Sequence, residues 1–421
     1  MNTRTLFILD GSQTMREFSG FHIDCDLHVP VSSNPGIKAG SGGPRTVGKS
    51  FWTCNCEATL EFCRVIFDIF GDDRKVALSV AEGDSITPMI LKDCSTLWED
   101  SLVSATQYVD ALFPYTRKLF ELEQKKTPKS IKHGAVLKNA ISLLSEGRSN
   151  ENDVGGRIIY LTRLSSNTAV ERLKNDLIET YKEFGDNWPF TSGCSITIVH
   201  TNAVGAEPKM FSCFPIDLVP GANFILEVTS AFSGKALTTC LYSLAMKHHG
   251  LVLTSIQGIP MKEEQGAGQS ANYDVELLHP ASVYDCLSAL PDFKNFIGTS
   301  IREGVPLKIA CMRWSTPKLS PSHDAQFRLH SFCASPLDLT SKPTQCLIQF
   351  LLKGRTVVLE PPTSTKSFTY CMMSVDGEIY LQAISSVKLP SDEVFEYTNI
   401  ADKVFFVIKF SRLSYAIIIY P

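Results

Sequence analysis

The sequence has almost no excess of charge of either sign. Its 40 lysines and arginines stand against 44 aspartates and glutamates, so the formal net charge is −4 at pH 7. A protein this close to neutral is not a general polycation, so it would contact nucleic acid only through a local patch. The early apolar run Leu6–Leu9 is too short for a signal peptide, and before residue 404 no stretch approaches the roughly 18–20 apolar residues of a membrane helix.

Sequence patterns of common catalytic and metal sites are also missing. There is no G-x-S-x-G sequence, and the sequence does not indicate a Ser, His and Asp that would form a triad. The pair Cys54-x-Cys56 and nearby Cys63 lack further cysteines or histidines at zinc-site spacing, so we interpret them as loop thiols and a core residue. We therefore assign no catalytic residue, no metal ligand and no cofactor.

Cysteine usage indicates a reducing compartment. The 13 cysteines are odd in number and irregularly spaced in a long chain, whereas a secreted disulfide framework is typically small and cysteine-dense. The apolar segment Val404–Pro421 is interrupted by Lys409 and Arg412, which a membrane anchor would tolerate poorly at its centre. We predict no membrane association.

Residues 1–250 alternate strand-like and helix-like segments, which predicts a doubly wound α/β domain. Period-two alternation in residues 21–29 adds one antiparallel edge hairpin, followed by a loop over 32–48. The expected strands are 6–10, 21–29, 76–80, 157–162, 195–200 and 224–228, and the expected helices are 57–70, much of 97–124, 134–146, 168–184 and 235–249.

Residues 251–390 are mostly strand-like. The expected strands are 251–256, 273–278, 307–314, 327–333, 356–359 and 378–384, with a single helix at 346–352. This pattern predicts a second domain that is a mostly antiparallel barrel or sandwich.

Residues Gly43, Gly48, Lys49 and Ser50 satisfy the phosphate-loop pattern G-x4-G-K-[ST]. In that motif a buried strand leads directly into the loop, but here a dozen loop residues separate the two. Pro44 also removes one amide donor from the cradle. We interpret the segment as a loop that fits the pattern by coincidence, and nucleotide binding stays as an alternative.

Asp10, Ser12 and Thr14 directly follow the first strand, where a carboxylate and two hydroxyls could hold a divalent cation. They resemble the first segment of the metal site of von Willebrand factor A-type domains. The other two segments do not match. Lys132 and His133 precede the helix expected over 134–146, where a threonine belongs, and Arg163 stands where an acid belongs after the strand 157–162. We prefer a capping and turn role for Ser12 and Thr14, with a metal-dependent binding module as an alternative.

Longer strings carry a more specific resemblance. Residues 259–265, IPMKEEQ, and 270–279, SANYDVELLH, are very similar to a signature of the Asunder family, also called Integrator complex subunit 13. Further blocks agree in the same order along the chain, namely 49–54, 61–64, 67–70, 156–159, 335–338, 346–355 and 377–379. The resemblance spans roughly residues 3 to 400.

This resemblance implies a von Willebrand factor A-like domain over 1–250 and an antiparallel β-barrel over 251–390. It implies a non-enzymatic scaffold that pairs with a similarly built Integrator subunit 14 in a heterodimer, near subunit 10 and other Integrator subunits. The implied role is 3′-end processing of small nuclear RNA and transcription regulation in the nucleus, with cytoplasmic and perinuclear pools. Dynein recruitment to the nuclear envelope during mitosis and weak nucleic-acid binding through the complex are implied as well.

The last residues depart from the family. Members continue with a helical region, a nuclear-import segment and a tail that contacts the cleavage module, whereas here 391–421 holds the start of that region and then a divergent apolar tail. We interpret the chain as a C-terminally truncated member. Nuclear import and contact with the cleavage module are therefore open for this chain.

Overall fold

The computed structural model describes residues 3–25, 45–71, 74–89, 98, 116–119, 121–122, 130–146, 155–209, 211, 213–262, 270–285, 297–315, 327–361 and 368–385. The chain divides into two compact units, Met1–Phe67 with Gly71–Leu241 and Asp68–Phe70 with Tyr242–Pro421. The predicted segment 391–421 and most of the helix expected over 97–124 lie outside the described residues. None of the described helices combines the length and apolar character needed to cross a bilayer.

The first unit contains a seven-stranded sheet in the order β5-β4-β1-β6-β7-β9-β8. Its strands are β1 (Arg4–Asp10), β4 (Lys75–Glu82), β5 (Ser85–Pro88), β6 (Gly156–Thr162), β7 (Cys194–Asn202), β8 (Cys213–Asp217) and β9 (Phe224–Phe232). The five central strands run parallel, and the edge strands β5 and β8 are antiparallel. Every residue of β1 is buried, as expected of a parallel strand covered on both faces.

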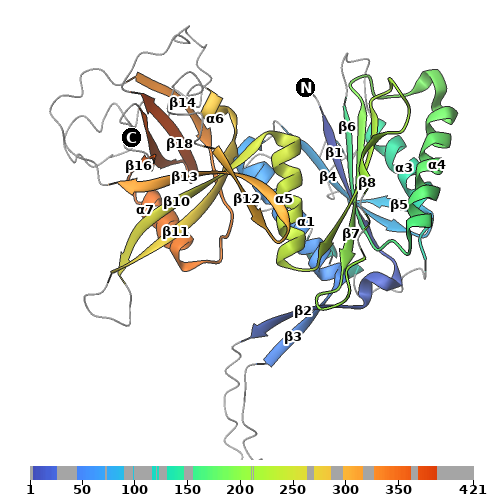
Figure 1. The fold of residues 1–421 in the computed structure, drawn as a ribbon, viewed down its shortest axis with the longest axis horizontal. Coiled ribbons are helices and arrows are strands. Elements are labelled where there is room, and N and C mark those ends of the chain that lie inside the picture. The colour runs from blue at the N-terminus through green and yellow to red at the C-terminus, as the bar shows by residue number, and fades with distance from the viewer. Residues whose placement is uncertain are drawn as a thin grey trace, which may run out of the picture. The chain divides into compact units, whose positions relative to one another are not determined.

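Helices cover both faces of this sheet (Figure 1). They are α1 (Phe51–Phe70), α3 (His133–Ser145), α4 (Asn167–Phe184) and α5 (Lys235–His249). Leu6 and Ile8 pack with the buried side chains of α3 and α4, whereas Phe7 points the other way and meets Phe62 of α1 with ring centroids 4.8 Å apart. The predicted doubly wound α/β arrangement is therefore present.

The N-terminus of α1 differs from the prediction. The helix begins at Phe51 rather than at residue 57, because the Ser50 hydroxyl accepts a hydrogen bond from the Thr53 amide at 3.1 Å and caps the first turn. The apolar period that marked the helix in the sequence starts only after this cap. At the other end Gly71 takes a positive φ of 53° and its N–H bonds the Phe67 carbonyl.

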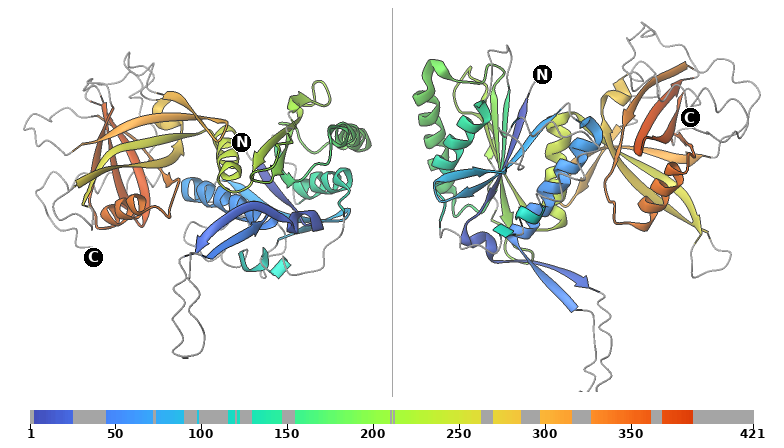
Figure 2. Two further views of the ribbon diagram at one scale, coloured as in Figure 1. Left: turned by 60° about the horizontal axis from the view of Figure 1, so that its bottom comes forward. Right: turned by 180° about the vertical axis from the view of Figure 1, so that it is seen from behind.

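The predicted edge hairpin is a separate element. Strands β2 (Phe18–Cys25) and β3 (Arg45–Ser50) form a two-stranded antiparallel ribbon, and in the described part of the chain they pair only with each other. The expectation of a loop over 32–48 is wrong for residues 45–48, which belong to β3. Figures 1 and 2 show this ribbon in blue. It leaves the first unit on the side of the sheet where β1 ends.

The second unit contains a nine-stranded sheet in the order β14-β18-β17-β16-β13-β10-β11-β15, with β12 paired to β13. Its strands are β10 (Leu251–Lys262), β11 (Ser270–Pro280), β12 (Ile297–Arg302), β13 (Val305–Ser315), β14 (Phe327–Cys333), β15 (Ser335–Pro336), β16 (Val357–Glu360), β17 (Phe368–Val375) and β18 (Glu378–Ser385). All described pairs are antiparallel except β10 with β13, so the sheet is mixed, and the prediction of mostly antiparallel strands agrees with it.

Among the described residues after β10, two helices accompany this sheet, whereas the sequence predicted one. Helix α7 (Lys342–Leu352) begins after Ser341, whose hydroxyl accepts from the Thr344 amide, and the short α6 (Ser282–Asp285) follows β11. A single turn such as α6 is too short to show helical periodicity in the sequence. Leu347 and Leu351 of α7 belong to the buried core on this sheet.

Candidate functional site

The parallel sheet has one topological switch point, between β1 and β6. The chain leaves β1 toward β4 on one side and later enters β6 on the other side of β1. In open α/β sheets ligands typically bind beyond the carboxyl ends of the strands at such a point. Here those ends carry Asp10 on β1 and Thr162 on β6, with Arg163 directly after Thr162.

The Asp10 carboxylate is buried and both of its oxygens accept hydrogen bonds. The Ser12 amide donates to Oδ1 at 2.8 Å, and the Thr162 hydroxyl donates to Oδ2 at 2.5 Å. The Ser12 and Thr14 hydroxyls bond each other at 2.9 Å. The structure thus brings the three candidate metal-site residues together. Ser12 stands at the N-cap position of the 3-10 helix Gln13–Arg16, as the preferred capping and turn role requires, but its hydroxyl bonds Thr14 and not a backbone amide.

A second polar pair lies at the same switch point. His133, the first residue of α3, places Nδ1 at 2.9 Å from the hydroxyl of buried Tyr160 on β6. Burial lowers the pKa of His133, although the Asp10 charge acts in the opposite direction. Burial, and then the Asp10 charge, raise the pKa of Tyr160. Both groups are therefore neutral at pH 7, so His133 does not supply the repelling charge that the sequence suggested.

Arg163 directly follows Thr162 at the end of β6. Its Nη1 donates to Glu17 Oε2 at 2.7 Å and to the Thr14 carbonyl at 3.4 Å, and its guanidinium carbon lies 4.1 Å from the centroid of the Phe51 ring. The Arg163 side chain is 29% exposed and Glu17 is 59% exposed. An ion pair with one partner this open to solvent contributes about 0–1 kcal/mol.

These residues do not fit a divalent cation. Hard cations are held by several oxygen ligands, whereas Asp10 is the single carboxylate of this set and each of its oxygens already accepts one hydrogen bond. The guanidinium of Arg163 adds a fixed positive charge at the opening. Within the described ranges, no group of three or more His, Cys, Asp or Glu side chains is placed to hold a metal. The metal-dependent alternative gains no support from this geometry.

The phosphate-loop lookalike forms a strand. Gly43 lies outside the described residues, and Gly48, Lys49 and Ser50 belong to β3, which runs straight into α1. Lys49 Nζ pairs with the Glu57 carboxylate at 2.6 Å, and Ser50 caps α1. A Cβ at Gly48 would stand 2.6 Å from the Phe18 ring, so this glycine makes room for an aromatic side chain rather than for a phosphate.

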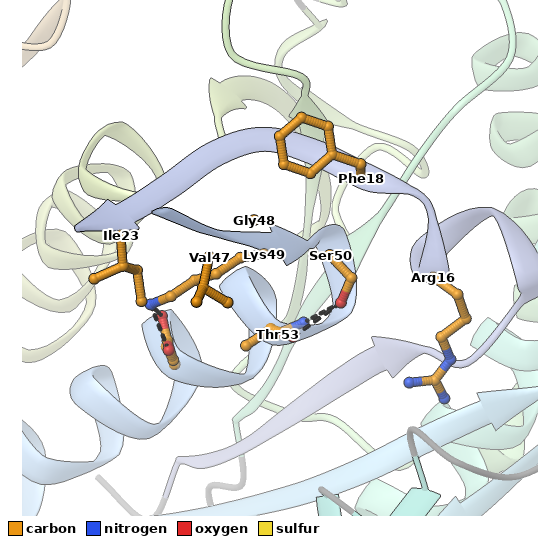
Figure 3. A pocket seen from close by; sticks show the side chains of 9 residues that line it. Arg16, Phe18, Ile23, Val47, Gly48, Lys49, Ser50 and Thr53 are labelled. Carbon is orange, nitrogen blue, oxygen red and sulfur yellow. Dashed lines mark hydrogen bonds and ion pairs between the residues drawn. The ribbon is translucent and has the colours of Figure 1, made fainter. Parts of the chain in front are cut away.

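A shallow groove of about 570 Å³ lies between the ribbon and α1 (Figure 3). It is lined by Arg16, Phe18, Ile23, Val47, Gly48, Lys49, Ser50, Thr53 and Glu57. Val47 and Ile23, which pair across the ribbon, are 49% and 38% exposed, and Phe18, whose ring lies on the opposite face against Gly48 (Figure 3), is 52% exposed. This surface cannot be recognised from the sequence, because the strand pattern of residues 21–29 does not show which face stays uncovered.

The base of the ribbon is fixed by close packing. Gly20 has a φ of 78°, and a Cβ there would stand 2.3 Å from the Val204 carbonyl oxygen. The buried Ser19 hydroxyl donates to the Lys49 carbonyl at 2.7 Å, which ties β2 to β3. The Phe21 ring lies against Gly234, where a Cβ would be 2.5 Å away. The exposed apolar side chains therefore stand on an anchored element.

Comparison with known proteins identifies the family. Residues 1–396 match the family described as cell cycle and development regulator Mat89Bb. The chain belongs to the Mat89Bb family. Protein asunder of Drosophila willistoni is 29% identical over 414 residues, which covers 93% of this chain and 58% of that protein. Protein asunder of Drosophila melanogaster is 28% identical over 430 residues, covering 94% of this chain and 60% of the relative.

These relatives confirm the predicted membership of the Asunder family. The Mat89Bb-family chain spans about three fifths of the length of the curated relatives that it matches. The family description makes its members regulators of the cell cycle and of development.

Solved structures are only distantly similar to the Mat89Bb-family chain. A von Willebrand factor type A protein from Catenulispora acidiphila has a TM-score of 0.30 at 10% identity, covering 97% of this chain and 71% of that one. PilB minor pilin from Streptococcus sanguinis has a TM-score of 0.32 at 11% identity, covering 59% of this chain and 61% of that one. Scores of this size are too low to argue for a shared fold.

Proposed function

We propose that this Mat89Bb-family chain is a non-enzymatic scaffold subunit of the Integrator complex, supporting 3′-end processing of small nuclear RNA and transcription regulation. The observation that carries the proposal is the match to the asunder proteins over 93% of the chain. The same family supports a role in mitotic cell-cycle progression, for which we propose dynein recruitment to the nuclear envelope. The protein would work in the nucleus, with cytoplasmic and perinuclear pools.

The switch-point geometry is consistent with binding rather than bond-making. The Asp10 carboxylate is buried and accepts one hydrogen bond at each oxygen, from Ser12 and from Thr162, which supports a structural role for it. Exposed apolar side chains stand instead on the anchored ribbon beside this point. A surface of this kind supports recognition through packed faces, as in other protein interfaces.

In this proposal the first unit is a von Willebrand factor A-like domain and the second closes into a β-barrel. The doubly wound strand order supports the first assignment. For the barrel, β14 and β15 stand at opposite ends of the nine-stranded sheet, yet only Ala334 separates them in the chain. A continuous chain segment that pairs with both ends of a sheet joins those ends, which is the requirement for closure.

The proposed partners are a subunit 14 homologue in a heterodimer, Integrator subunit 10 and other Integrator subunits, and dynein. Weak nucleic-acid binding would arise through the complex, and no membrane contact is proposed. A chain with a net charge of −4 has no overall field that attracts nucleic acid, so the partner would supply much of such a surface.

Co-expression with the subunit 14 homologue from the same organism tests the proposal. We expect a one-to-one heterodimer by size-exclusion chromatography with light scattering. An A-type-domain protein from outside Integrator, expressed in the same way, is the control and should not co-elute. Two separate monomer peaks with the subunit 14 homologue would contradict the proposed function.

A further inference from the structure

We propose that Arg163 binds a carboxylate on an extended, apolar segment of a partner protein, and that Glu17 occupies this position in the free chain. The inference rests on the proposed scaffold function and adds the chemistry that one of its faces recognises. It concerns the switch point between β1 and β6 together with the groove beside the ribbon.

The Arg163 guanidinium is fixed by its neighbours, and only one of its nitrogens donates hydrogen bonds to described residues. Its guanidinium lies over the Phe51 ring at 4.1 Å, and its hydrogen bonds to Glu17 and Thr14 both use Nη1. Among the described residues, Nε and Nη2 have no hydrogen-bond partner. A guanidinium fixed on an aromatic face with two adjacent nitrogens open matches the geometry of a bidentate carboxylate.

Glu17 resembles a ligand that the chain supplies to itself. Its carboxylate meets Arg163 through a single oxygen and is 59% exposed, so solvent already competes for the pair. Its backbone is fixed independently, because the Glu17 carbonyl accepts from the Phe51 amide at 3.1 Å. The side chain can therefore swing away from Arg163 without disturbing the start of α1.

The apolar groove is adjacent to this pair along the chain. Arg16 and Phe18, the neighbours of Glu17, both line it, and Val47 and Ile23 extend it along the ribbon. An extended peptide advances about 3.3 Å per residue, so the inference requires a carboxylate and an apolar side chain a few positions apart on one extended segment.

Charge decides between possible occupants. Within the groove Lys49 pairs with Glu57 and Arg16 adds a positive charge, and displacement of Glu17 leaves Arg163 without its carboxylate. An acidic group restores that pairing, whereas a purely apolar or basic segment does not. A protein segment is favoured over a small anion because the exposed Ile23 and Val47 gain only from an apolar partner.

A randomised octapeptide library displayed on phage tests the inference with the full-length chain. Selection is run on Glu17→Gln, which frees Arg163, and in parallel on Arg163→Ala. We expect enrichment of Asp or Glu at one position, followed by apolar residues, with Glu17→Gln only. The enriched peptide, made synthetically and labelled with fluorescein, should bind Glu17→Gln about tenfold more tightly than wild type, because a charge-assisted hydrogen bond is worth at least that factor.

Matched variants and peptides make the result decisive. Arg172→Ala removes an exposed arginine of α4 and should leave the affinity unchanged, and the Asn version of the peptide should not distinguish Glu17→Gln from wild type. Equal enrichment on the two baits, or an Asn peptide that binds as tightly as the Asp peptide, overturns the inference. Binding only after phosphoserine replaces the Asp overturns it in favour of a phosphopeptide partner.

The same variants separate this inference from the proposed function. If Arg163→Ala and Glu17→Gln both form the heterodimer with the subunit 14 homologue but no acidic peptide is enriched, the inference fails and the scaffold role stands. If acidic peptides are enriched but no heterodimer forms, the carboxylate site stands and the proposed function fails. Retained thermal midpoints in both variants show that the comparison is made on folded protein.

Discussion

At the scale of single residues, buried polar groups in the first unit satisfy one another across long separations in sequence. Asp10 and Thr162 are 152 positions apart and share a hydrogen bond, and the Leu164 amide donates to His200 Nδ1 at 2.8 Å. A buried group without such a partner is costly, so each bond constrains both residues. These contacts make the carboxyl edge of the sheet a rigid base for Arg163.

Replacing Asp10 by Ala should destabilise the first unit by about 2–4 kcal/mol, because the Ser12 amide and the Thr162 hydroxyl both lose their buried acceptor. Asp10→Asn keeps one acceptor oxygen and should cost less. Urea denaturation measures both. Asp84→Ala, which changes a carboxylate that is 65% exposed, is the matched control and should lie within about 0.5 kcal/mol of wild type. Equal losses from Asp10→Ala and Asp84→Ala would contradict this view.

Stability should fall in mild acid. Burial lowers the pKa of His200 and the pKa of His279 to about 4, below the value of about 6.5 expected in the unfolded chain. Between pH 6.5 and 4 the unfolded chain therefore binds more protons than the folded chain. The stabilisation is complete above pH 6.5 and is lost as the pH falls toward 4.

Thermal midpoints recorded from pH 7.5 to pH 4.5 test this dependence. His279→Gln and His200→Gln should each flatten the profile, since each removes one group that titrates only on unfolding. His22→Gln, at an exposed position of β2, is the control for the substitution itself. The same slope in all four proteins would assign the acid sensitivity to other groups.

At the scale of elements, the two-stranded ribbon β2–β3 is held in place by close contacts that only glycines allow. Isolated hairpins are marginal in water, and this one is held where β2 passes Val204 and Gly234. Gly20 lies within the register shift between Phe18 and His22, so a bulge and a positive φ coincide at the contact.

Gly20→Ala should destabilise the ribbon by more than a positive-φ alanine alone. Gly205 has a similar φ of 80°, and a Cβ there would have no neighbour within 4 Å, so Gly205→Ala isolates the backbone cost of about 1 kcal/mol. Gly20→Ala adds a clash with the Val204 carbonyl and should cost about 2–3 kcal/mol. We expect the backbone amides of β2 and β3 to exchange faster in Gly20→Ala but not in Gly205→Ala. Equal exchange rates in the two variants would contradict the role of Gly20 in anchoring the ribbon.

The apolar periodicity of the sequence predicted where most helices and strands lie but not how the strands pair. The apolar spacing in 134–146 and 168–184 predicted α3 and α4, and the apolar runs predicted β1, β6 and β7. Strands β3, β5, β8, β12, β15 and β17 were missed, and the hairpin containing the strand predicted at 21–29 was expected at the edge of the main sheet. Short or edge strands carry too few buried positions to show a pattern, and pairing depends on residues far away in the chain.

At the scale of the whole molecule, each unit has a hydrophobic core of its own. The core of the first unit gathers side chains of β1, β6, β7, α3 and α4, and that of the second gathers β10, β11, β13, β17 and α7. The second also contains a buried network in which Thr254 Oγ1 lies 2.6 Å from His279 Nε2 and 2.5 Å from the Tyr284 hydroxyl. Two cores imply that each unit can unfold by its own transition.

Calorimetry should resolve two transitions that respond to different substitutions. Thr254→Val removes the central hydroxyl of the network and should lower only the transition of the second unit, by about 1–3 kcal/mol. Asp10→Ala should lower only the other transition. If both variants shift one common transition by similar amounts, the two units unfold together and the prediction is wrong.

The sequence by itself determined the alternation of helices and strands, the change of character near residue 250 and the Asunder family, because periodicity and long ordered strings are local properties of the chain. It also marked Asp10, Ser12, Thr14 and Arg163 as neighbours of one sheet edge. Only the tertiary structure decided their chemistry. Thr162 donates a hydrogen bond to Asp10, Arg163 pairs with Glu17, and the residues of the phosphate-loop lookalike pair with β2 as a strand. Such contacts depend on side chains from distant segments meeting in space, which no local pattern encodes.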